Sequence, residues 1–522
     1  MALADRCDIL VVGSGNAGFS AAISAAEAGS ARVLLIDTCP EEWAGGNTYF
    51  TAGAYRTVHG GLQDVLPLVN NVSPEQIANI ELAPYLEQNF SDDIERACSS
   101  RSDPELARIL VKDSNSTIKW LASHGIRFQL SFNRQAYEVG GKIKFWGGMC
   151  LKTQDGGKGL VADFRAAAKT SAVTVSWSTT LISVQNDSSS GHSIITVEKD
   201  GTQQTIEAKA IIFAAGGFES NPRMRSEHLG PGWDRAMVRG TPFNTGSCLE
   251  LCLRDLNAKA VGDWSGCHSV AWDAAANPTT GDREASNEYT KSGYPLGLMI
   301  NVHGHRFVDE GVDFRNYTYA KFGRAILSQP EHVAFQIWDA RGAEWLRDEE
   351  YRPERVERIM ADSIELLAQK CVPRGLRDAE QFSRTVQDYN EAVYGFQHEN
   401  PDAAWDPAVK DGYSTQSSMR RLDLPKSNWA LPLDHGPFVA VKVTCGITFT
   451  FGGLQIEPES AQLVSAKDGN SMQGLYCVGE MMGGLFYGNY PGGSGLMSGA
   501  VFGRRAGRAA AEAILKSSTG PI

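Results

Sequence analysis

The feature that most constrains this chain is a run of four apolar residues, 9–12, followed at once by three glycines. Gly13, Gly15 and Gly18 have the spacing G-x-G-x-x-G, and an alanine-rich stretch, residues 19–26, comes next. The apolar run is typical of a buried parallel strand and the alanine-rich stretch of a helix. Gly13 permits a tight turn, Gly15 lets the backbone approach a pyrophosphate, and Gly18 lets the helix pack close to the strand. The pattern predicts a helix N-terminus that binds phosphate.

A second apolar run strengthens this interpretation. Residues 33–36 form the run, and Asp37 ends it. A carboxylate about 20 residues after the glycines is where dinucleotide-binding domains hold a ribose hydroxyl. The strand, glycines, helix, second strand and acid occur in the required order, which is far more specific than the glycine spacing alone. We therefore predict a nucleotide-binding α/β domain; the alternative is a glycine turn in another kind of α/β protein.

Composition excludes several classes of protein. The 522 residues are enough for two or three domains, and the net charge of −12 disfavours nucleic acid or an anionic membrane surface as a partner. No stretch approaches the length of a transmembrane helix, and residues 1–7 are too short and polar for a signal peptide, so a cytoplasmic or organelle-lumen enzyme is expected. The ten cysteines include no C-x-x-C pair, which favours buried free thiols over disulfides and predicts no metal site.

Further along, regular elements alternate. Helical spacing covers residues 104–124, and strand-like alternation covers residues 173–215. Residues 210–217 form another buried strand that ends in glycines, so they would approach the same nucleotide. Residues 474–480 read as a strand with a terminal acid, and residues 496–514 as a helix of small residues.

The character of the chain changes in the middle. Between residues 263 and 444, aromatic and polar residues alternate with turns, and helical segments are expected at 353–370 and 379–393. Residues 445–522 again contain a strand, a glycine-rich loop and a helix of small residues, like the first part of the chain. We therefore predict that residues 1–262 and 445–522 form one domain and that residues 263–444 are inserted into it.

Five segments together resemble the flavoprotein subunits of succinate dehydrogenase and fumarate reductase, the FAD-dependent oxidoreductase 2 family. The segments occur in the right order over nearly the whole chain: 13–18, 45–48, 214–218, 304–310 and 478–480. Within that superfamily the chain looks most like the tricarballylate dehydrogenase branch. The segments that carry this closer likeness are 309–319, 426–430 and 446–453.

The resemblance implies a fold and a reaction. The expected fold is α/β, with a Rossmann-like FAD-binding domain of the glutathione-reductase type and an inserted, mobile α+β capping domain. The expected reaction is hydride transfer between flavin N5 and a CH–CH bond next to a carboxylate or carbonyl. Either direction, dehydrogenation or alkene reduction, is consistent with the sequence.

The resemblance also assigns FAD contacts. In these proteins an acid at the position of Asp37 holds the adenosine ribose, and the loop at residues 45–48 lies along the isoalloxazine ring. Membrane-complex members attach FAD through a histidine in this loop; here Asn47 and Thr48 stand there, so noncovalent FAD is expected. Glu480 matches an acid near the ribityl chain, and the last helix would stabilise the reduced flavin. The predicted FAD-binding residues are Gly13, Ser14, Gly15, Asn16, Ala17, Gly18, Asp37, Thr38, Gly45, Gly46, Asn47, Thr48, Ala215, Gly216, Glu480, Ser494, Gly495 and Leu496.

Three residues are predicted to be catalytic: Arg315, His268 and Tyr490. Arg315 falls where fumarate reductases place a proton-donating arginine, a role that needs strong electrostatic support because free arginine keeps its proton. His268 matches a histidine that bonds the substrate carboxylate. Tyr490 precedes Pro-Gly, as does a tyrosine of 3-ketosteroid dehydrogenases that polarises a carbonyl. The alternatives are an ion pair for Arg315, a core histidine for His268 and a packed tyrosine for Tyr490.

Two departures from fumarate reductases bear on the substrate. Those enzymes carry a His-His pair where this chain has Thr448-Phe449, and an arginine where it has Tyr490. One carboxylate clamp is therefore absent, and plain fumarate reduction is not expected. Four further cations are candidate carboxylate partners, although each is alternatively a solvated charge: Arg134, Lys144, Arg239 and Lys442.

Two classes of function follow. The first is an FAD enzyme acting on a polycarboxylate such as tricarballylate, or alternatively on a carbonyl substrate in the manner of a 3-ketosteroid dehydrogenase or an ene-reductase. The second is a noncatalytic flavin-binding subunit for electron transfer. Arg315 and the capping segment favour the first. The sequence has no cysteine cluster for an iron–sulfur centre and no haem motif, so the expected electron acceptor is separate: a quinone, an electron-transfer protein or oxygen.

Overall fold

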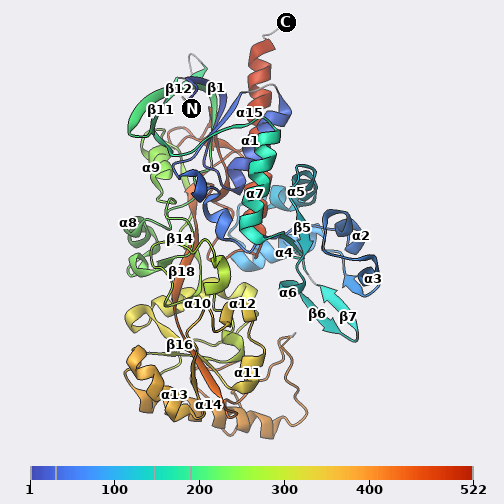
Figure 1. Cartoon of the computed structure of the whole chain (residues 1–522), viewed down its shortest axis with the longest axis vertical. Helices are drawn as coiled ribbons and strands as arrows, with labels where there is room; N and C mark the ends of the chain where they lie inside the picture. Colours follow the sequence, from blue (N-terminus) through green and yellow to red (C-terminus); the bar gives the residue numbers. More distant parts are fainter. Residues whose placement is uncertain (1–2, 30–31, 146, 188–190, 408, 520–522) are drawn as a thin grey trace. The chain divides into compact units, whose positions relative to one another are not determined.

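The computed structural model of the chain describes residues 3–29, 32–145, 147–187, 191–407 and 409–519. The chain divides into two compact units. The first comprises residues 1–230, 240–267 and 448–522, and the second comprises residues 231–239 and 268–447. Two long strands, β14 (Ala260–Asp273) and β18 (Phe438–Leu454), run from one unit into the other (Figure 1). The predicted insertion, residues 263–444, begins and ends inside these two strands.

An eight-stranded sheet forms the centre of the first unit. Its strands are β1 (Arg6–Val12), β2 (Val33–Ile36), β9 (Thr174–Ser176), β10 (Thr179–Asp187), β11 (His192–Lys199), β12 (Thr202–Phe213), β19 (Gln462–Val464) and β20 (Ser471–Cys477). The order is β10-β11-β12-β1-β2-β9, with β20 beside the end of β12 and β19 beside β20. Strand β1 pairs in parallel with β2 and β12, whereas β10, β11 and β12 are antiparallel. Residues 9–12 are buried, as expected for a strand covered on both faces.

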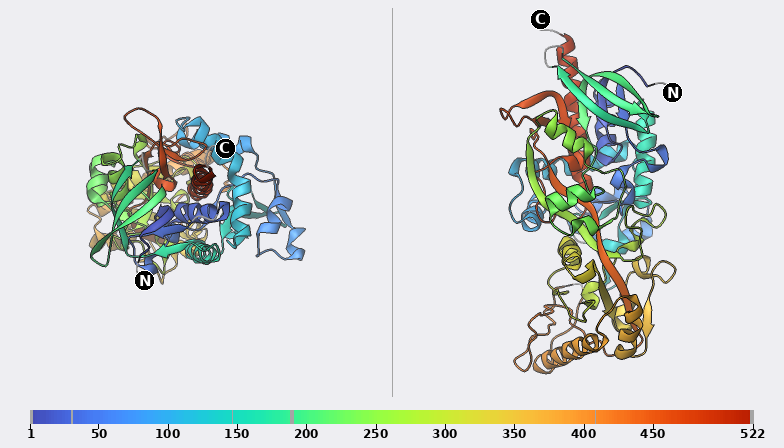
Figure 2. Two further views of the ribbon diagram at one scale, coloured as in Figure 1. Left: turned by 90° about the horizontal axis from the view of Figure 1, so that it is seen from above. Right: turned by 90° about the vertical axis from the view of Figure 1, so that its left-hand side faces the viewer.

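The longer helices of the first unit are α1 (Asn16–Ala28), α4 (Glu87–Cys98), α5 (Pro104–Ser123), α7 (Gly156–Thr170), α9 (Ser247–Arg254) and α15 (Ser494–Thr519). Helices α1 and α15 lie side by side (Figures 1 and 2). Gly499, Gly503 and Gly507 recur every fourth residue of α15 and therefore share one face. A Cβ on Gly507 would lie 2.2 Å from the backbone oxygen of Ala21. The small residues of the final helix thus permit backbone contact with α1.

Two small sheets and several short helices complete the first unit. One sheet consists of β3 (Ala54–Tyr55), β5 (Phe128–Leu130) and β8 (Leu151–Thr153), and the other of β4 (Ile80–Leu82), β6 (Ala136–Val139) and β7 (Lys142–Phe145). The short helices are α2 (Leu62–Val65), α3 (Pro74–Ile77), α6 (Phe132–Gln135) and α8 (Pro222–Met224).

The second unit mixes helices with a largely antiparallel sheet. Its strands are β13 (Met237–Val238), β15 (Leu298–Asn301), β16 (Ala334–Trp338) and β17 (Ile359–Ala361), and its helices are α10 (Tyr319–Leu327), α11 (Ala340–Glu344), α12 (Asp348–Tyr351), α13 (Ile364–Cys371) and α14 (Ala379–Glu399). Strand β18 pairs with β13, β16 and β17. Helix α14 buries Phe382, Val386, Tyr389 and Val393, which lie on one helical face in the core of this unit.

The expected α/β class is confirmed, and so are most of its elements. Helix α5 fills the helix expected at 104–124, and Asp103 caps it by accepting the N–H groups of Glu105 (2.9 Å) and Leu106 (3.1 Å). The prediction of a helix at 353–370 was wrong for the first half of that segment. There the buried, exposed, buried pattern of Ile359–Ala361 has a period of two, and the segment pairs with β18 as strand β17.

Two further features concern the chain as a whole. All ten cysteines are buried, as predicted for thiols inside apolar segments. Within the described residues, the structure offers no helix with the length and apolar character that a bilayer crossing requires.

The contact between α1 and α15 gives a test of the packing. Gly-to-Ala changes in helices ordinarily stabilise by about 1 kcal/mol. We expect Gly507→Ala to do the opposite and lower the free energy of unfolding by about 1–3 kcal/mol, because its Cβ meets immovable backbone. Chemical denaturation measures this. Arg508→Ala, at an exposed position of the same helix, is the control and should change stability by less than about 0.5 kcal/mol; an equal effect of the two would contradict the packing.

Candidate active site

The glycine turn joins β1 to α1. Gly13 has a φ of +109°, a backbone conformation that favours glycine. A Cβ on Gly18 would lie 1.9 Å from the backbone oxygen of Gly13, and a Cβ on Gly13 would lie 2.3 Å from that of Ala214 at the end of β12. A larger residue at either position would collide with backbone, so the helix can begin directly against two strand ends.

Gly15 is different, and it tests whether the site fits a dinucleotide. A Cβ there would meet only Thr48 Oγ1 at 3.6 Å and Gly45 O at 3.8 Å, which is ordinary contact. The protein's own packing therefore does not demand glycine at this position, whereas a phosphate close to the backbone does. The first turn of α1 contains no acidic residue, so its N–H groups present an uncompensated positive potential. The residues present fit a pyrophosphate.

Asp37 links the ribose position to the glycine turn. One carboxylate oxygen accepts the N–H of Ser14 (2.7 Å), and the other accepts the N–H two residues after Asp37 (3.0 Å). Ser14 Oγ in turn accepts the N–H of Gly45 (3.1 Å). A carboxylate has about four acceptor positions, so Asp37 keeps capacity for a ribose hydroxyl. The adjacent Thr38 bonds Thr180 through its hydroxyl (2.6 Å) and ties the ends of β2 and β10 together.

Asn16 joins three segments that are far apart in the sequence. Its N–H donates to Thr48 Oγ1 (2.9 Å), its Nδ2 donates to the backbone oxygen of Leu496 (2.7 Å), and its Oδ1 accepts from the Tyr55 hydroxyl (2.6 Å). The side chain is buried. Asn16 therefore holds the glycine turn, the loop at 45–48 and the start of α15 against one another.

The ends of β12 and β20 lie at the same edge of the sheet as the glycine turn, because these strands run parallel to β1. Ala215 donates its N–H to the sulfur of Met481 (3.2 Å). A Cβ on Gly216 would lie 2.4 Å from the side chain of Asn244. Ala17 is buried in α1, and a Cβ on Gly479 would lie 2.7 Å from it. The predicted FAD residues of the first unit thus surround one sheet edge.

Tyr490 belongs to an aromatic cluster just before α15. The cluster consists of Phe449, Phe451, Phe486 and Tyr490. The Tyr490 ring centroid lies 5.4 Å from that of Phe449, in an edge-to-face arrangement. Ser494 begins the helix and donates its hydroxyl to Pro491 O (2.5 Å), and a Cβ on Gly495 would lie 3.5 Å from the Tyr490 ring. Two of the three positions at which the chain departs from fumarate reductases, 449 and 490, are therefore in this cluster.

Two glutamates meet beside the loop at 45–48. The side-chain amides of Asn47 and Asn244 donate to Glu219 Oε1, the latter over 2.6 Å. Glu480 Oε1 accepts the N–H (2.7 Å) and the hydroxyl (3.0 Å) of Thr450. Burial raises the pKa of Glu219 to about 7, and burial together with the charge of Glu219 raises the pKa of Glu480 well above its ordinary value.

Sequence reasoning singled out Asn47 and Glu480 but missed Glu219. Glu219 is fully buried, although nothing in its spacing distinguishes it from a surface acid. The available signal was its place, three residues after the glycine pair begins at Gly216, at the end of a buried strand that already pointed to the cofactor.

In the second unit, the Ser292 hydroxyl connects Arg315 to the buried carboxylate of Glu350. Arg315 Nη1 lies 3.4 Å from the hydroxyl of Ser292. Ser292 donates its hydroxyl (2.5 Å) and its N–H (2.9 Å) to Glu350 Oε2, and Arg347 lies 3.4 Å from the other oxygen of Glu350. Sequence reasoning missed both Ser292 and Glu350, because they reach Arg315 only through tertiary contacts.

His268, on β14, is held as a neutral imidazole. Burial, aided by the positive charge of Arg239, lowers the pKa of His268 to about 3. The His268 ring packs edge-on against Tyr319, with centroids 5.9 Å apart. Tyr319 begins α10 four residues after Arg315. The structure therefore associates His268 with Arg239 directly and with the Arg315 segment through Tyr319.

The four additional cations separate into two groups. Arg239 stays with His268; its guanidinium donates to Asn287 Oδ1 (2.6 Å) and lies 5.3 Å from the centre of the Trp272 ring.

The other cations are engaged elsewhere. Lys144 pairs with Glu81 (3.4 Å) on a small sheet of the first unit. Lys442 donates to the backbone oxygen of Arg374 (2.7 Å) in the second unit. The side chain of Arg134 lies outside the described residues. Arg239 is therefore the candidate that the structure leaves beside a predicted catalytic residue.

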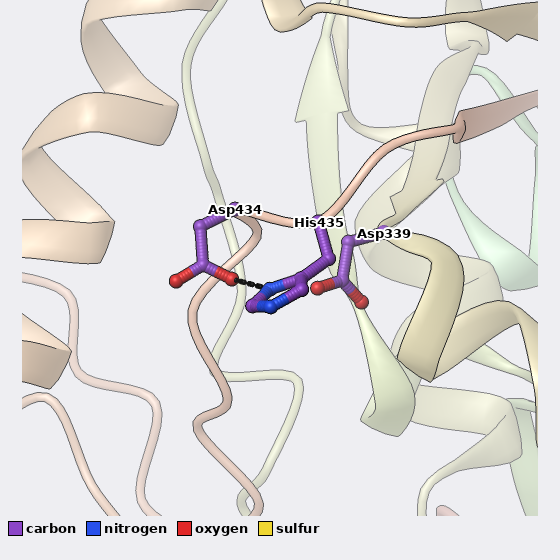
Figure 3. A group of neighbouring side chains, drawn as sticks. All are labelled: Asp339, Asp434 and His435. Atoms are coloured by element: carbon purple, nitrogen blue, oxygen red, sulfur yellow. Dashed lines mark hydrogen bonds and ion pairs between the residues drawn. The ribbon is translucent and has the colours of Figure 1, made fainter.

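One group in the second unit has the composition of a metal site. Asp339, Asp434 and His435 lie close together, and His435 Nδ1 bonds Asp434 (Figure 3). The Arg341 guanidinium lies 2.8 Å from Asp339 and 2.5 Å from Asp434, and Asp339 also caps α11 through the N–H of Gly342 (2.9 Å). Because a cation of the protein already neutralises both carboxylates, we assign no metal to this group.

Comparisons with known proteins identify the family of this chain. Residues 8–496 match the family described as FAD binding domain. A probable fumarate reductase from Shewanella frigidimarina is 27% identical over 514 residues, covering 97% of this chain and 75% of that protein. An NADH:fumarate oxidoreductase from Klebsiella pneumoniae is 26% identical over 519 residues, covering 97% of this chain and 48% of that protein. This chain therefore spans about three quarters of the first relative and about half of the second.

A solved structure shows the same fold. The 3-ketosteroid Δ1-dehydrogenase from Sterolibacterium denitrificans, in complex with 1,4-androstadiene-3,17-dione, has a TM-score of 0.70 and 17% identity, covering 98% of this chain and 100% of that one. The family match and the two relatives define a flavoprotein oxidoreductase of the class that acts on CH–CH groups. The chain belongs to the FAD-binding family whose members include fumarate reductases, and FAD is its cofactor.

The pKa of His268 gives a test of the second unit. An unfolded imidazole gains a proton near pH 6.5, whereas His268 stays neutral in the folded chain down to about pH 3. The folded state then binds fewer protons, so His268 makes the free energy of unfolding decrease as pH falls through this window. We expect His268→Asn to remove that contribution, measured by urea unfolding at a series of pH values. The exposed His398, changed to Asn, is the control; parallel curves for wild type and His268→Asn would refute the assignment.

Proposed function

We propose that this enzyme interconverts a CH–CH bond and a C=C bond next to a carboxylate, in the manner of the tricarballylate dehydrogenase branch. The observation that carries the proposal is the group of donors in the second unit. Arg239 adjoins His268, whose partner Tyr319 is in the segment of Arg315. Two guanidinium groups and a neutral imidazole form a donor set suited to holding a carboxylate.

The aromatic cluster narrows the range of substrates that the proposal allows. Fumarate reductases carry a histidine and an arginine where this chain has Phe449 and Tyr490, and both rings pack in the cluster. A second carboxylate held by cations at these positions is therefore not supported. A polycarboxylate anchored elsewhere, with tricarballylate as the first candidate, fits better than a four-carbon dicarboxylate.

The chain's own residues have distinct roles in this proposal. Bound FAD supplies the hydride chemistry. Dehydrogenation also requires a group that takes the acidified α-proton, and alkene reduction requires the same group to give it back. Arg315 is that group, and Ser292, itself bonded to the buried carboxylate of Glu350, positions its guanidinium. His268 and Arg239 hold the carboxylate or carbonyl on which charge builds.

A second candidate function is the oxidation or reduction of a carbonyl substrate in the manner of a 3-ketosteroid dehydrogenase or an ene-reductase. The packing of Tyr490 among aromatic rings favours it, because such a surface suits an apolar skeleton and the hydroxyl can polarise a carbonyl. A noncatalytic flavin-binding subunit for electron transfer is the third candidate.

Partners and compartment are proposed on the same basis. Electrons would leave to a separate acceptor: a quinone, an electron-transfer protein or oxygen. FAD is proposed to be noncovalent, because Asn47 and Thr48 occupy the loop in which membrane-complex relatives carry the attaching histidine. A cytoplasmic site is consistent with ten buried thiols in one chain.

Anaerobic flavin absorbance tests the function directly. The FAD-loaded protein is mixed with tricarballylate, succinate and a saturated 3-ketosteroid, and the dithionite-reduced protein with a simple enone. Bleaching by tricarballylate is the expected result. Bleaching only by the steroid would replace the carboxylate proposal with the carbonyl one. Reoxidation of the flavin by the enone alone would identify a reductase. No change of flavin absorbance in any mixture would support the noncatalytic subunit.

Arg315→Gln tests the proton carrier. We expect the rate of flavin bleaching to fall about 10²–10⁴-fold, since the variant loses its proton-transferring group. FAD content, read from the ratio of flavin to protein absorbance, should stay at the wild-type level. Arg384→Gln, an exposed arginine on α14, is the matched control and should bleach at the wild-type rate. A wild-type rate in Arg315→Gln would remove Arg315 from the mechanism.

Tyr490→Phe separates the two substrate classes, because it deletes the hydroxyl and keeps the ring in the cluster. With a carboxylate substrate we expect an unchanged rate of bleaching. A loss of about 10²-fold or more would instead show that the hydroxyl stabilises charge on a carbonyl.

A further inference from the structure

Glu219 and Glu480 form an acidic pair that the proposed chemistry does not use. All the bonds described above go to one oxygen of each residue, Oε1. The other oxygen of Glu219, Oε2, is buried and has no hydrogen-bond donor among the described residues. A buried carboxylate oxygen without a donor costs free energy comparable to a lost hydrogen bond, so this oxygen needs an explanation.

The second glutamate lies where it can supply the missing donor. A Cβ on Gly217, two residues before Glu219, would lie 2.2 Å from Glu480 Oε1. The charge of Glu219 acts directly on Glu480. The Arg225 guanidinium donates to the backbone oxygen of Glu219 (2.6 Å). The groups that face the two carboxylates are the amides of Asn47 and Asn244, the Thr450 N–H and hydroxyl, and each other.

We infer that Glu219 and Glu480 share one proton, and that this protonated pair positions Asn47 in the flavin loop. Two buried carboxylates side by side cannot both be ionised without a cation, and a single proton turns their repulsion into a hydrogen bond. The pair then carries one negative charge instead of two.

The consequence reaches the cofactor through Asn47. Its Nδ2 donates both to Glu219 and to the backbone oxygen of Thr448 (2.6 Å), and its Oδ1 accepts the N–H of Thr241 (2.9 Å). The protonated pair therefore fastens the loop Gly46–Phe50 to β18. Glu219 and Glu480 act as positioning residues for FAD. The inference concerns FAD binding alone, so its failure would leave the proposed reaction untouched.

The pair makes FAD binding depend on pH. The pKa of Glu219 is raised from its ordinary value of 4.5 to about 7. The folded state therefore binds the extra proton, and the free energy of unfolding falls as pH rises from about 4.5 to about 7. Above about 7 the pair holds one proton, on Glu480, because burial and the charge of Glu219 raise the pKa of Glu480 well above its ordinary value. At still higher pH the pair becomes doubly charged, the carboxylates repel one another, and the loop loosens its hold on FAD.

Glu219→Gln tests this in the FAD-loaded protein. The glutamine Oε1 can still accept from Asn47 and Asn244, and its amide can donate to Glu480 as the shared proton would. FAD release, followed by flavin fluorescence, and the midpoint of thermal unfolding are measured from acidic to alkaline pH. Wild type should release FAD progressively as pH rises above about 7 and Glu480 loses its proton, whereas Glu219→Gln should hold it without that dependence. Glu227→Gln, an exposed glutamate nearby, should follow wild type.

The outcomes decide the inference. If Glu219→Gln keeps the wild-type dependence of both readouts on pH, the shared proton does not exist. If the variant does not fold, infrared spectroscopy of the wild-type holoprotein decides, because a protonated carboxylic acid has a carbonyl band distinct from that of a carboxylate. The band should be present at mildly acidic pH, persist past about 7 and disappear at higher pH; its absence at mildly acidic pH overturns the inference.

Discussion

The first unit depends on the hydrogen bonds of Asn16. This residue is buried at the start of α1, and its three polar groups bind Thr48, Tyr55 and Leu496. The glycine turn, the loop at 45–48 and the last helix, all predicted to contact FAD, are thereby held together by one residue. A neutral amide suits this place, because it both donates and accepts without bringing a buried charge. The precision of the site comes from this arrangement of loops rather than from any single loop.

Much of the first unit could be predicted from local patterns. The glycine spacing, the apolar strands and the capped helix at Asp103 are determined by residues close in sequence, and the structure shows them. Glu219 and Glu350 could not be found in this way. Each is an ordinary acid in the sequence and becomes a buried partner only when strands and helices far apart in the chain pack together. Strand β17 was misjudged for a similar reason, since its pairing with β18 outweighs its local helical pattern.

The segment that carries the family resemblance in the second unit has a mainly structural role. Arg306 and Glu310 form a buried ion pair (2.5 Å), and Glu310 also accepts the N–H of Met299 (2.9 Å). Such a pair stabilises only when its remaining polar groups are satisfied, and here backbone groups satisfy them. Beside it, burial lowers the pKa of Lys426 to about 8. The residues that resemble the family in this unit thus stabilise its core, while the residues proposed to be catalytic lie next to them in the same unit.

The packing of α15 against α1 has a consequence for the order of synthesis. The small-residue face of α1 emerges from the ribosome long before α15, the helix that covers it. Contacts between residues so distant in sequence form slowly, since the whole intervening chain must be brought together first. During translation the nascent nucleotide site is therefore open on one side, and the second unit, which lies wholly within the interior of the sequence, can fold before the first is closed.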